Sequence, residues 1–261
     1  MDEIPVIKAA LLGIGTVGGG VYKLVQRQRE ELPLKTGTAL EISRILVRDK
    51  TKSRPGVDPS LLTEDWEEIL HDPEIRIVIE VMGGIEPART YILEALRAGK
   101  NVVTANKDLL AEDGEILKHT ARDHQVDLNY EAAVAGGIPI IQPLEQCLAG
   151  NFVTEVMGII NGTTNYILTR MSRENMDYGK ALAEAEAKGY AEADPTADVE
   201  GYDAARKLAI MACEAFHSRV TFADVYTEGI THITPEDIRY AHEFGYEIKL
   251  VGMARCYDGS I

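Results

Sequence analysis

The feature that most constrains the fold is an apolar segment at residues 7–12, followed directly by Gly13-Ile-Gly-Thr-Val-Gly18 and by an amphipathic stretch that reaches about residue 32. A buried strand, a glycine turn and a helix in this order are typical of the first βαβ unit of a dinucleotide-binding domain. The glycines would allow a tight turn, a close approach of the pyrophosphate and close strand–helix packing. The helix N-terminus would offer its free N–H groups to the phosphates. A glycine-rich turn without a ligand is the alternative, which the βαβ context disfavours. The predicted cofactor-binding residues here are Gly13, Gly15, Thr16, Val17 and Gly18.

The rest of the N-terminal half alternates between strand and helix patterns. Further strands are expected at residues 40–47, 75–82, 101–105 and 126–131, and helices at 64–71, between Pro87 and Gly99, and at 115–124. Such alternation is typical of an α/β fold, with a parallel sheet covered by helices on both faces. We therefore predict a Rossmann domain over residues 1–133, which would bind NAD(P).

The alternation stops near Gly136-Gly137 and Pro139, so a second domain is expected over residues 134–261. Its pattern is α+β, which suits a substrate-binding and dimerisation domain. The expected helices are at 140–148, 163–171, 178–188, 199–216 and 235–244, and the expected strands at 153–160 and 247–257. Asp258-Gly259 predicts a hairpin turn, but no return strand follows it. Because an open strand edge is a liability, we expect a chain that is incomplete at its C-terminus, or a partner chain that supplies the missing strand.

Composition and charge exclude several classes of protein. The net charge of −15 argues against nucleic acid or an anionic membrane as the main partner, because both require a basic surface. No apolar run is long enough to span a bilayer, and the acidic start Met1-Asp2-Glu3 is unlike a secretory signal. The three cysteines and six histidines show no metal-binding or disulfide spacing. A cytoplasmic protein is expected.

The residues after the second strand bear on the choice between NAD and NADP. A carboxylate there would bind the ribose 2′-hydroxyl, whereas an arginine favours the 2′-phosphate. The sequence Arg48-Asp49-Lys50 carries both signals. Two cations against one carboxylate favour NADP, with Arg48 and Lys50 as cofactor-binding residues, while NAD and a merely solvated charged loop stay open.

Two further segments carry side chains suited to chemistry. Thr104-Ala-Asn-Lys107 follows a strand and so lies at the carboxyl edge of the sheet, where open α/β sheets bind ligands. An acidic loop from Glu192 to Asp198 leads into an alanine-rich helix, for which Asp198 is the expected N-cap. Asp203 and Lys207 are four residues apart on that helix. Spacing alone favours a surface ion pair worth a few tenths of a kcal/mol, but the few charges of this apolar helix point to a role in a site.

Five segments together resemble a homoserine dehydrogenase, in the expected order along the whole chain. They are Gly13 to Gly18, Thr104 to Lys107, Glu131-Ala-Ala-Val-Ala-Gly-Gly-Ile-Pro139, Asn161-Gly-Thr-Thr-Asn-Tyr166, and Glu192-Ala-Asp-Pro through Lys207. The resemblance implies the reversible NAD(P)H-dependent reduction of L-aspartate 4-semialdehyde to L-homoserine, a step toward threonine, methionine and isoleucine. Members of the family usually continue beyond the point that corresponds to Ile261.

The resemblance also implies roles for individual residues. Lys207 matches the lysine that exchanges the proton of the substrate hydroxyl, and Asp203 matches the carboxylate that assists it. Glu192 matches the residue that holds the substrate amino group, and we place Asp198 of the same loop with it. Lys107, and with it Thr104, would lie beside nicotinamide and substrate. The implied monovalent-cation site consists of Glu131 and the carbonyls of Val134, Gly136 and Ile138, and it is expected to hold sodium or a cation of potassium size.

The sequence leaves other functions open. One is a different Rossmann dehydrogenase with a lysine acid/base, acting on another amino acid or a sugar. Another is a non-catalytic sensor that binds NAD(P). Because the second domain has few ways to cover its apolar faces within one chain, we also expect a homodimer formed mainly by residues after about Ile140.

Overall fold

The computed structural model describes residues 4–257 and 261, which form two compact units, Met1–Gly137 and Ile138–Ile261. The boundary predicted from the sequence falls slightly earlier, between residues 133 and 134. The assignment of cofactor binding to one unit and of substrate binding and dimerisation to the other remains our prediction.

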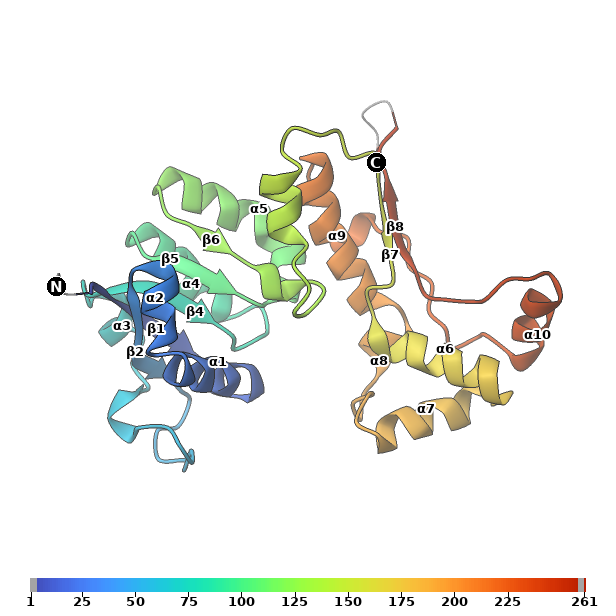
Figure 1. Cartoon of the computed structure of the whole chain (residues 1–261), viewed down its shortest axis with the longest axis horizontal. Helices are drawn as coiled ribbons and strands as arrows, with labels where there is room; N and C mark the ends of the chain where they lie inside the picture. The colour runs from blue at the N-terminus through green and yellow to red at the C-terminus, as the bar shows by residue number, and fades with distance from the viewer. Residues whose placement is uncertain (1–3, 258–260) are drawn as a thin grey trace. The chain divides into compact units, whose positions relative to one another are not determined.

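The first unit is a six-stranded parallel sheet in the order β3-β2-β1-β4-β5-β6. Its strands are β1 Val6–Leu12, β2 Ala39–Leu46, β3 Leu62–Thr63, β4 Ile75–Glu80, β5 Asn101–Thr104 and β6 Leu128–Asn129. The helices that flank it are α1 Thr16–Arg27, α2 Glu31–Thr36, α3 Glu67–Leu70, α4 Ala88–Arg97 and α5 Lys107–Asp123, with short 3₁₀ turns η1 Pro59–Leu61 and η2 Glu131–Ala133 (Figure 1). The strand order reverses between β1 and β4, which is the point where doubly wound sheets bind dinucleotides. The predicted Rossmann fold is confirmed.

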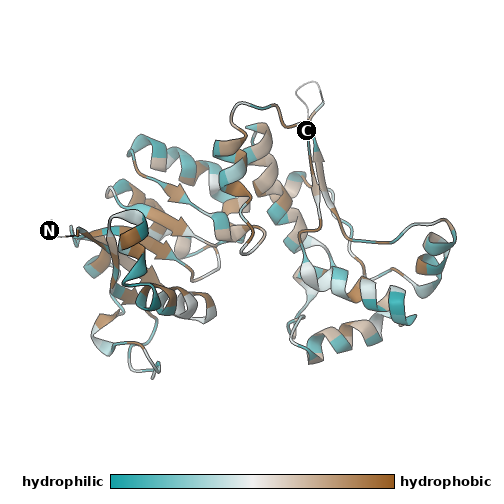
Figure 2. Cartoon of the chain, viewed as in Figure 1, coloured by the Kyte–Doolittle hydropathy of each residue, from teal (hydrophilic) through white to brown (hydrophobic). Residues whose placement is uncertain are grey.

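The central strands of this sheet are largely apolar because helices cover both faces of the sheet. Ala9, Leu11 and Ile45 are fully buried, and Val78 and Val102 continue the same core on the neighbouring strands. Figure 2 shows the contrast between the hydrophobic strands and the hydrophilic outer faces of the helices. This packed sheet fixes the positions of the loops at its carboxyl edge.

Three helices of the first unit differ from the prediction. The predicted first helix divides into α1 and α2, and the helix expected at 64–71 is the shorter α3. Helix α5 begins at Lys107 and not near residue 115, because Asn106 caps it by accepting the N–H of Leu109 (3.2 Å). Glycine has a low helix propensity, and yet Gly114 lies in the interior of α5.

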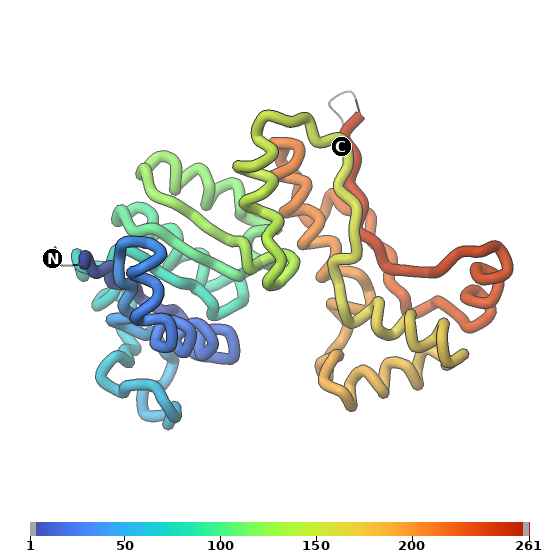
Figure 3. The backbone as a smooth tube through the Cα atoms, viewed as in Figure 1, coloured from blue at the N-terminus to red at the C-terminus, as the bar shows by residue number. Residues whose placement is uncertain are grey.

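The second unit is mostly helical. Its helices are α6 Gly162–Glu174, α7 Tyr178–Ala187, α8 Thr196–Val199, α9 Tyr202–Phe216 and α10 Pro235–Glu243, with a π-helical turn η3 Pro143–Cys147 and a 3₁₀ turn η4 Phe222–Asp224. The strands β7 Glu155–Gly158 and β8 Gly252–Arg255 pair antiparallel. Figure 3 shows these distant segments of the chain side by side. Buried residues such as Ile167, Met171 and Ala185 form the core between α6 and α7.

Several expectations for the second unit need correction. Both predicted strands are shorter than expected, and the strand expected at 247–257 reduces to β8, which pairs with β7 on one side. The helix expected at 140–148 is π-helical at residues 143–147, where Pro143 lacks the N–H of a regular turn. The Asp258-Gly259 turn lies outside the described residues.

The helix predicted over 199–216 is also divided. Asp198 is therefore not the N-cap of the long helix but a residue of α8, and Gly201, with a left-handed φ of 81°, caps α9. A carbonyl oxygen of Glu228 would lie 3.1 Å from a Cβ on Gly201, so both φ and space favour glycine there. Across the described residues, no helix is long and apolar enough to cross a membrane.

Candidate active site

The glycine turn between β1 and α1 has the shape that a dinucleotide requires. Gly13 has a φ of 97°, and a Cβ on Gly18 would lie 2.2 Å from the Gly13 carbonyl oxygen, so the fold itself requires both glycines. Gly15 is the N-cap of α1, and a Cβ there would meet nothing within 4 Å. Thr16 and Val17, in the first turn of α1, are exposed, and that turn carries neither an acidic residue nor a side-chain cap. Its N–H groups are thus available to an anion such as a pyrophosphate.

The segment after β2 presents its two cations to solvent. Arg48, Asp49 and Lys50 are all exposed. Asp49 Oδ1 accepts hydrogen bonds from the hydroxyl (2.6 Å) and the backbone N–H (2.8 Å) of Thr51, and these bonds hold the pKa of Asp49 below its ordinary value. The carboxylate is therefore engaged in its own turn, whereas the side chains of Arg48 and Lys50 are exposed to solvent.

A buried carboxylate organises the carboxyl edge of the sheet. Glu80, the last residue of β4, is fully buried and accepts three hydrogen bonds. The hydroxyl of Thr104 donates to Oε2 (2.6 Å), and the N–H groups of Met82 and Gly83 donate to Oε1 (2.8 and 3.2 Å). The end of β5 is thus tied to the loop that follows β4. We call Glu80, Thr104 and Asn106 the Glu80 network.

Asn106 completes this network beside Lys107. Its N–H donates to Thr104 Oγ1 (3.0 Å), and its side-chain nitrogen donates to the Gly84 carbonyl (2.7 Å). Lys107 follows as the first residue of α5 and is half-buried. The helix dipole disfavours a cation in the first turn of a helix, so helix stability does not explain why a lysine stands at position 107. The side chain of Thr104 is buried in the network, so a cofactor contact by this residue would use its main chain.

Asp203 and Lys207 form a partly buried pair and not the exposed pair that spacing alone favours. Lys207 Nζ lies 2.6 Å from Asp203 Oδ2, and the two side chains are 20% and 8% exposed. By contrast, the surface pair Lys35–Glu31 is 69% and 63% exposed. Lys207 also donates to the carbonyl of Ile160 at 3.1 Å. Two oxygens thus hold the ammonium group in one place.

Asn161 joins this pair to the acidic loop. Its side-chain nitrogen donates to Asp198 Oδ1 (2.7 Å) and to Asp203 Oδ2 (2.9 Å). Its side-chain oxygen caps α6 by accepting the N–H of Thr164 (2.9 Å). We call Asn161, Asp198, Asp203 and Lys207 the Asn161 network. From the sequence alone Asn161 has no predicted role beyond its place in the motif that resembles the family. Its one signal is that of an N-cap residue directly before a predicted helix.

The same motif holds the loop that carries Glu192. The hydroxyl of Thr163 donates to the carbonyl of Tyr190 (2.7 Å), and the rings of Tyr166 and Tyr190 are in contact at 4.7 Å between centroids. Glu192 follows two residues later and is exposed. The beginning of α6 therefore contacts Tyr190, just before the acidic loop, and Asp198, at the end of the loop.

The predicted cation ligands lie in one continuous segment. Glu131 begins η2, Val134 is fully buried, and Gly136 and Ile138 are exposed. Ala135 and Gly136 have φ values of 58° and 60°, which turn the chain sharply here. An all-oxygen donor set of one carboxylate and several carbonyls suits a hard cation. Among residues 4–257 and 261 no group of three or more His, Cys, Asp or Glu side chains is placed to hold a metal ion.

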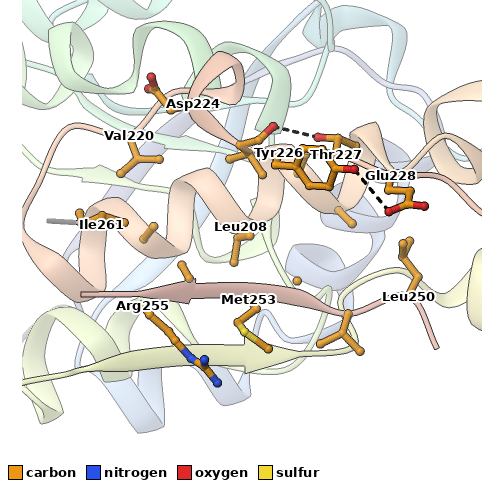
Figure 4. Close-up of a pocket in the computed structure, with 18 of the residues that line it drawn as sticks. Leu208, Val220, Asp224, Tyr226, Thr227, Glu228, Leu250, Met253, Arg255 and Ile261 are labelled. Atoms are coloured by element: carbon orange, nitrogen blue, oxygen red, sulfur yellow. Dashed lines mark hydrogen bonds between the residues drawn. The ribbon is translucent and has the colours of Figure 1, made fainter. Parts of the chain in front are cut away.

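A cavity of about 700 Å³ lies elsewhere in the second unit (Figure 4). It is bounded by β8, by the segment around Val220 to Glu228, and by the face of α9 that carries Ala204 and Leu208. Asp203 and Lys207 do not line it. This cavity is therefore distinct from the residues suited to proton transfer.

Comparison with known proteins agrees with this architecture. Residues 13–131 match the homoserine dehydrogenase NAD binding domain, and residues 139–260 match homoserine dehydrogenase. A homoserine dehydrogenase of Mycobacterium tuberculosis is 54% identical over 252 residues, which cover 97% of this chain and 57% of that protein. The crystal structure of a homoserine dehydrogenase from Thiobacillus denitrificans superposes with a TM-score of 0.91 at 45% identity, covering 97% of this chain and 59% of the other.

The coverage of a third protein is higher. A putative homoserine dehydrogenase from Archaeoglobus fulgidus has a TM-score of 0.85 at 36% identity, and the match covers 95% of this chain and 80% of that one. The chain spans little more than half the length of the curated relatives; for the mycobacterial protein the share is 57%. The first unit contains the residues that match the NAD binding domain of this family, and the chain as a whole belongs to the homoserine dehydrogenase family.

Proposed function

We propose that the protein catalyses the reversible NAD(P)-dependent reduction of L-aspartate 4-semialdehyde to L-homoserine. The observation that carries this proposal is the partly buried Asp203–Lys207 pair, fixed by Asn161 and Ile160, in a chain of this family. A surface ion pair would have no need of such fixation.

Lys207 has the chemistry that the reaction requires. Reduction of an aldehyde builds negative charge on its oxygen, which an ammonium group stabilises and protonates. An ammonium has three N–H donors, and within the described residues two of those of Lys207 are used, by Asp203 and by Ile160. The third can serve the substrate oxygen. In the reverse direction the neutral amine takes the proton of the homoserine hydroxyl. Bound NAD(P)H would supply the hydride for the aldehyde carbon.

The acidic loop would hold the amino group of the substrate. Glu192 is exposed, so its carboxylate is available to an ammonium ion. Asp198 would add the negative charge of a second carboxylate, and Asn161 orients this carboxylate by donating to its Oδ1. Lys107 would lie beside the nicotinamide, at the start of α5, which Asn106 of the Glu80 network holds in place.

For the cofactor we propose NADP over NAD. The exposed Arg48 and Lys50 favour a 2′-phosphate, and the carboxylate of Asp49 is engaged with Thr51. We further propose that Glu131 and the carbonyls of Val134, Gly136 and Ile138 hold sodium. Sodium would fix the turn at Ala135 through oxygen ligands alone.

We also propose a homodimer that forms through residues after about Ile140. The strands β7 and β8 and their flanks expose four large apolar side chains, Met157, Ile159, Val251 and Met253. Exposed apolar patches mark interaction sites. A stable interface of this kind buries at least ~1,000 Å². Light scattering at micromolar concentration tests it, since a monomer would contradict it. We also propose that the protein acts in the cytoplasm, in the synthesis of threonine, methionine and isoleucine.

Steady-state oxidation of L-homoserine, followed by the absorbance of the reduced cofactor, tests the function. We expect turnover with NADP⁺ and weaker turnover with NAD⁺. Turnover of another amino acid or a sugar alcohol in place of homoserine would favour a different dehydrogenase. Dinucleotide binding without turnover of any such substrate would favour a non-catalytic sensor.

A further inference from the structure

Asn161 is the side chain on which the two carboxylates of the proposed site converge. Its amide nitrogen lies 2.7 Å from Asp198 Oδ1 and 2.9 Å from Asp203 Oδ2. An amide nitrogen carries two hydrogens, so each carboxylate receives one. Asn161 is 5% exposed, and water therefore has little access to replace either bond.

The amide oxygen of Asn161 is committed as well. It accepts hydrogen bonds from the N–H (2.9 Å) and the hydroxyl (2.8 Å) of Thr164. Because an N–H of the helix backbone can only donate, the oxygen must face α6 and the nitrogen must face the carboxylates. The capping bond thus sets the orientation of the amide, and the orientation decides what Asp198 and Asp203 meet.

Asp203 Oδ2 is the atom that Asn161 and Lys207 share. It accepts from Asn161 Nδ2 at 2.9 Å and from Lys207 Nζ at 2.6 Å. The carbonyl of Ile160, next to Asn161 in the chain, accepts from the same ammonium group. Ile160 and Asn161, the two residues before α6, therefore contact Lys207 and Asp203 respectively. A cation at position 161 would compete with Lys207 for this oxygen, whereas a neutral amide orients it.

We propose that Asn161 is a positioning residue for proton transfer by Lys207. It holds Asp203 in the orientation that keeps the ammonium group directed at the substrate, and it bridges two carboxylates without adding charge. The kinetic part of this inference rests on the proposed function, whereas its structural part concerns the Asn161 network alone.

The sharpest kinetic variant is Asn161→Asp, which has nearly the same shape. It keeps an oxygen to cap α6, loses both donors, and adds a negative charge that faces Asp198 of α8 and Asp203 of α9 beside the cation Lys207. We expect kcat for homoserine oxidation to fall by at least about 10-fold, with the KM for the dinucleotide within about 3-fold. We also expect the acid limb of the kcat/KM profile to move to higher pH, because like charges favour protonation.

Asn165→Asp is the matched control. Asn165 lies in the first turn of the helix that Asn161 caps and is also buried, but its amide donates to the carbonyls of Asn161 and Leu250 and not to a carboxylate. We expect this variant to lose thermal stability while kcat stays within about 3-fold of the wild type. If both variants lose stability and both keep kcat and the pH profile, Asn161 is only a helix cap and the proposal fails.

A labelling experiment tests the structural part without a substrate. Asn161→Ser keeps a capping oxygen, but its short hydroxyl cannot bridge both carboxylates. We expect Lys207 to be reductively methylated at least about 3-fold faster in this variant, measured by peptide mass spectrometry against Lys35 as internal reference. An unchanged rate at Lys207 would overturn the inference even if the enzyme oxidises homoserine. A faster rate in a protein that does not oxidise homoserine would support it and refute the proposed function instead.

Discussion

The two units place a lysine at the edge of a polar network in opposite ways. In the first unit the Glu80 network directs its hydrogen bonds inward, so the buried carboxylate is satisfied by one hydroxyl and two backbone N–H groups. In the second unit the Asn161 network brings two carboxylates to one amide and pairs one of them with Lys207. The first arrangement fixes loops, which suits the proposed cofactor site. The second holds an ammonium group against a carboxylate, which suits the proposed proton transfer.

Replacement of the two lysines should separate these roles most strongly. Lys207→Ala should lower kcat for homoserine oxidation by about 10²–10⁴-fold with little change in dinucleotide affinity, because the proton donor is lost. Lys207→Arg should fail nearly as badly, since a guanidinium keeps its proton. Lys107→Ala should raise the KM for homoserine by a larger factor than it lowers kcat. The opposite pattern in steady-state kinetics would make Lys107 the acid–base residue.

Two substitutions in the glycine turn should separate the stability of the first unit from its affinity for the dinucleotide. Gly18→Ala should destabilise the first unit by about 1–3 kcal/mol, because its Cβ would lie 2.2 Å from a backbone oxygen. Gly15→Ala should leave the unfolding free energy within about 1 kcal/mol, since nothing lies within 4 Å of the added carbon, yet weaken dinucleotide binding at least about 10-fold. Urea denaturation and calorimetric titration measure the two effects. Normal affinity in Gly15→Ala would place the pyrophosphate elsewhere.

A smaller effect is expected at the ribose. Replacing Arg48 and Lys50 together with glutamine should weaken NADP binding about 10-fold more than NAD binding, because only NADP carries the 2′-phosphate. The ratio of the two dissociation constants is the measurement. Lys52→Gln, in the same exposed loop, serves as the control for net charge. Equal losses for NADP and NAD would show that Arg48 and Lys50 do not contact the 2′-phosphate.

The smallest expected effect concerns stability in acid. Hydrogen bonds from Lys188, Tyr166 and Arg170 lower the pKa of Glu184 to about 2, from an ordinary value of 4.5. Its contribution to the stability of α6 and α7 is therefore present above pH 4.5 and is lost as the pH falls toward 2. Glu184→Gln should flatten this part of the pH dependence of the unfolding free energy. Asp49→Asn in the first unit provides the comparison, and identical curves for wild type and Glu184→Gln would contradict the assignment.

The first unit could be predicted well because its signals are local in sequence. The central strands β1 and β4 are short apolar runs that the parallel sheet largely buries, and helix patterns separate them along the chain. The two-residue strand β3 has no such pattern and was not predicted. The second unit was harder to predict. The sequence favours one long helix over 199–216, yet Gly201 adopts a left-handed conformation between α8 and α9. That break moves Asp198 from a helix cap to a partner of Asn161.

The sequence by itself determined the family and the Rossmann fold, and it predicted Lys207 and Asp203 as the residues for proton exchange. Only the tertiary structure decided how those residues are held. Asn161 and Asp203 are far apart in the chain, and so are Glu80 and Thr104, but packing brings each pair within hydrogen-bond distance. Buried polar groups must find such partners because water does not reach them. Spacing along a helix shows which side chains share a face, but it does not show which other element covers that face.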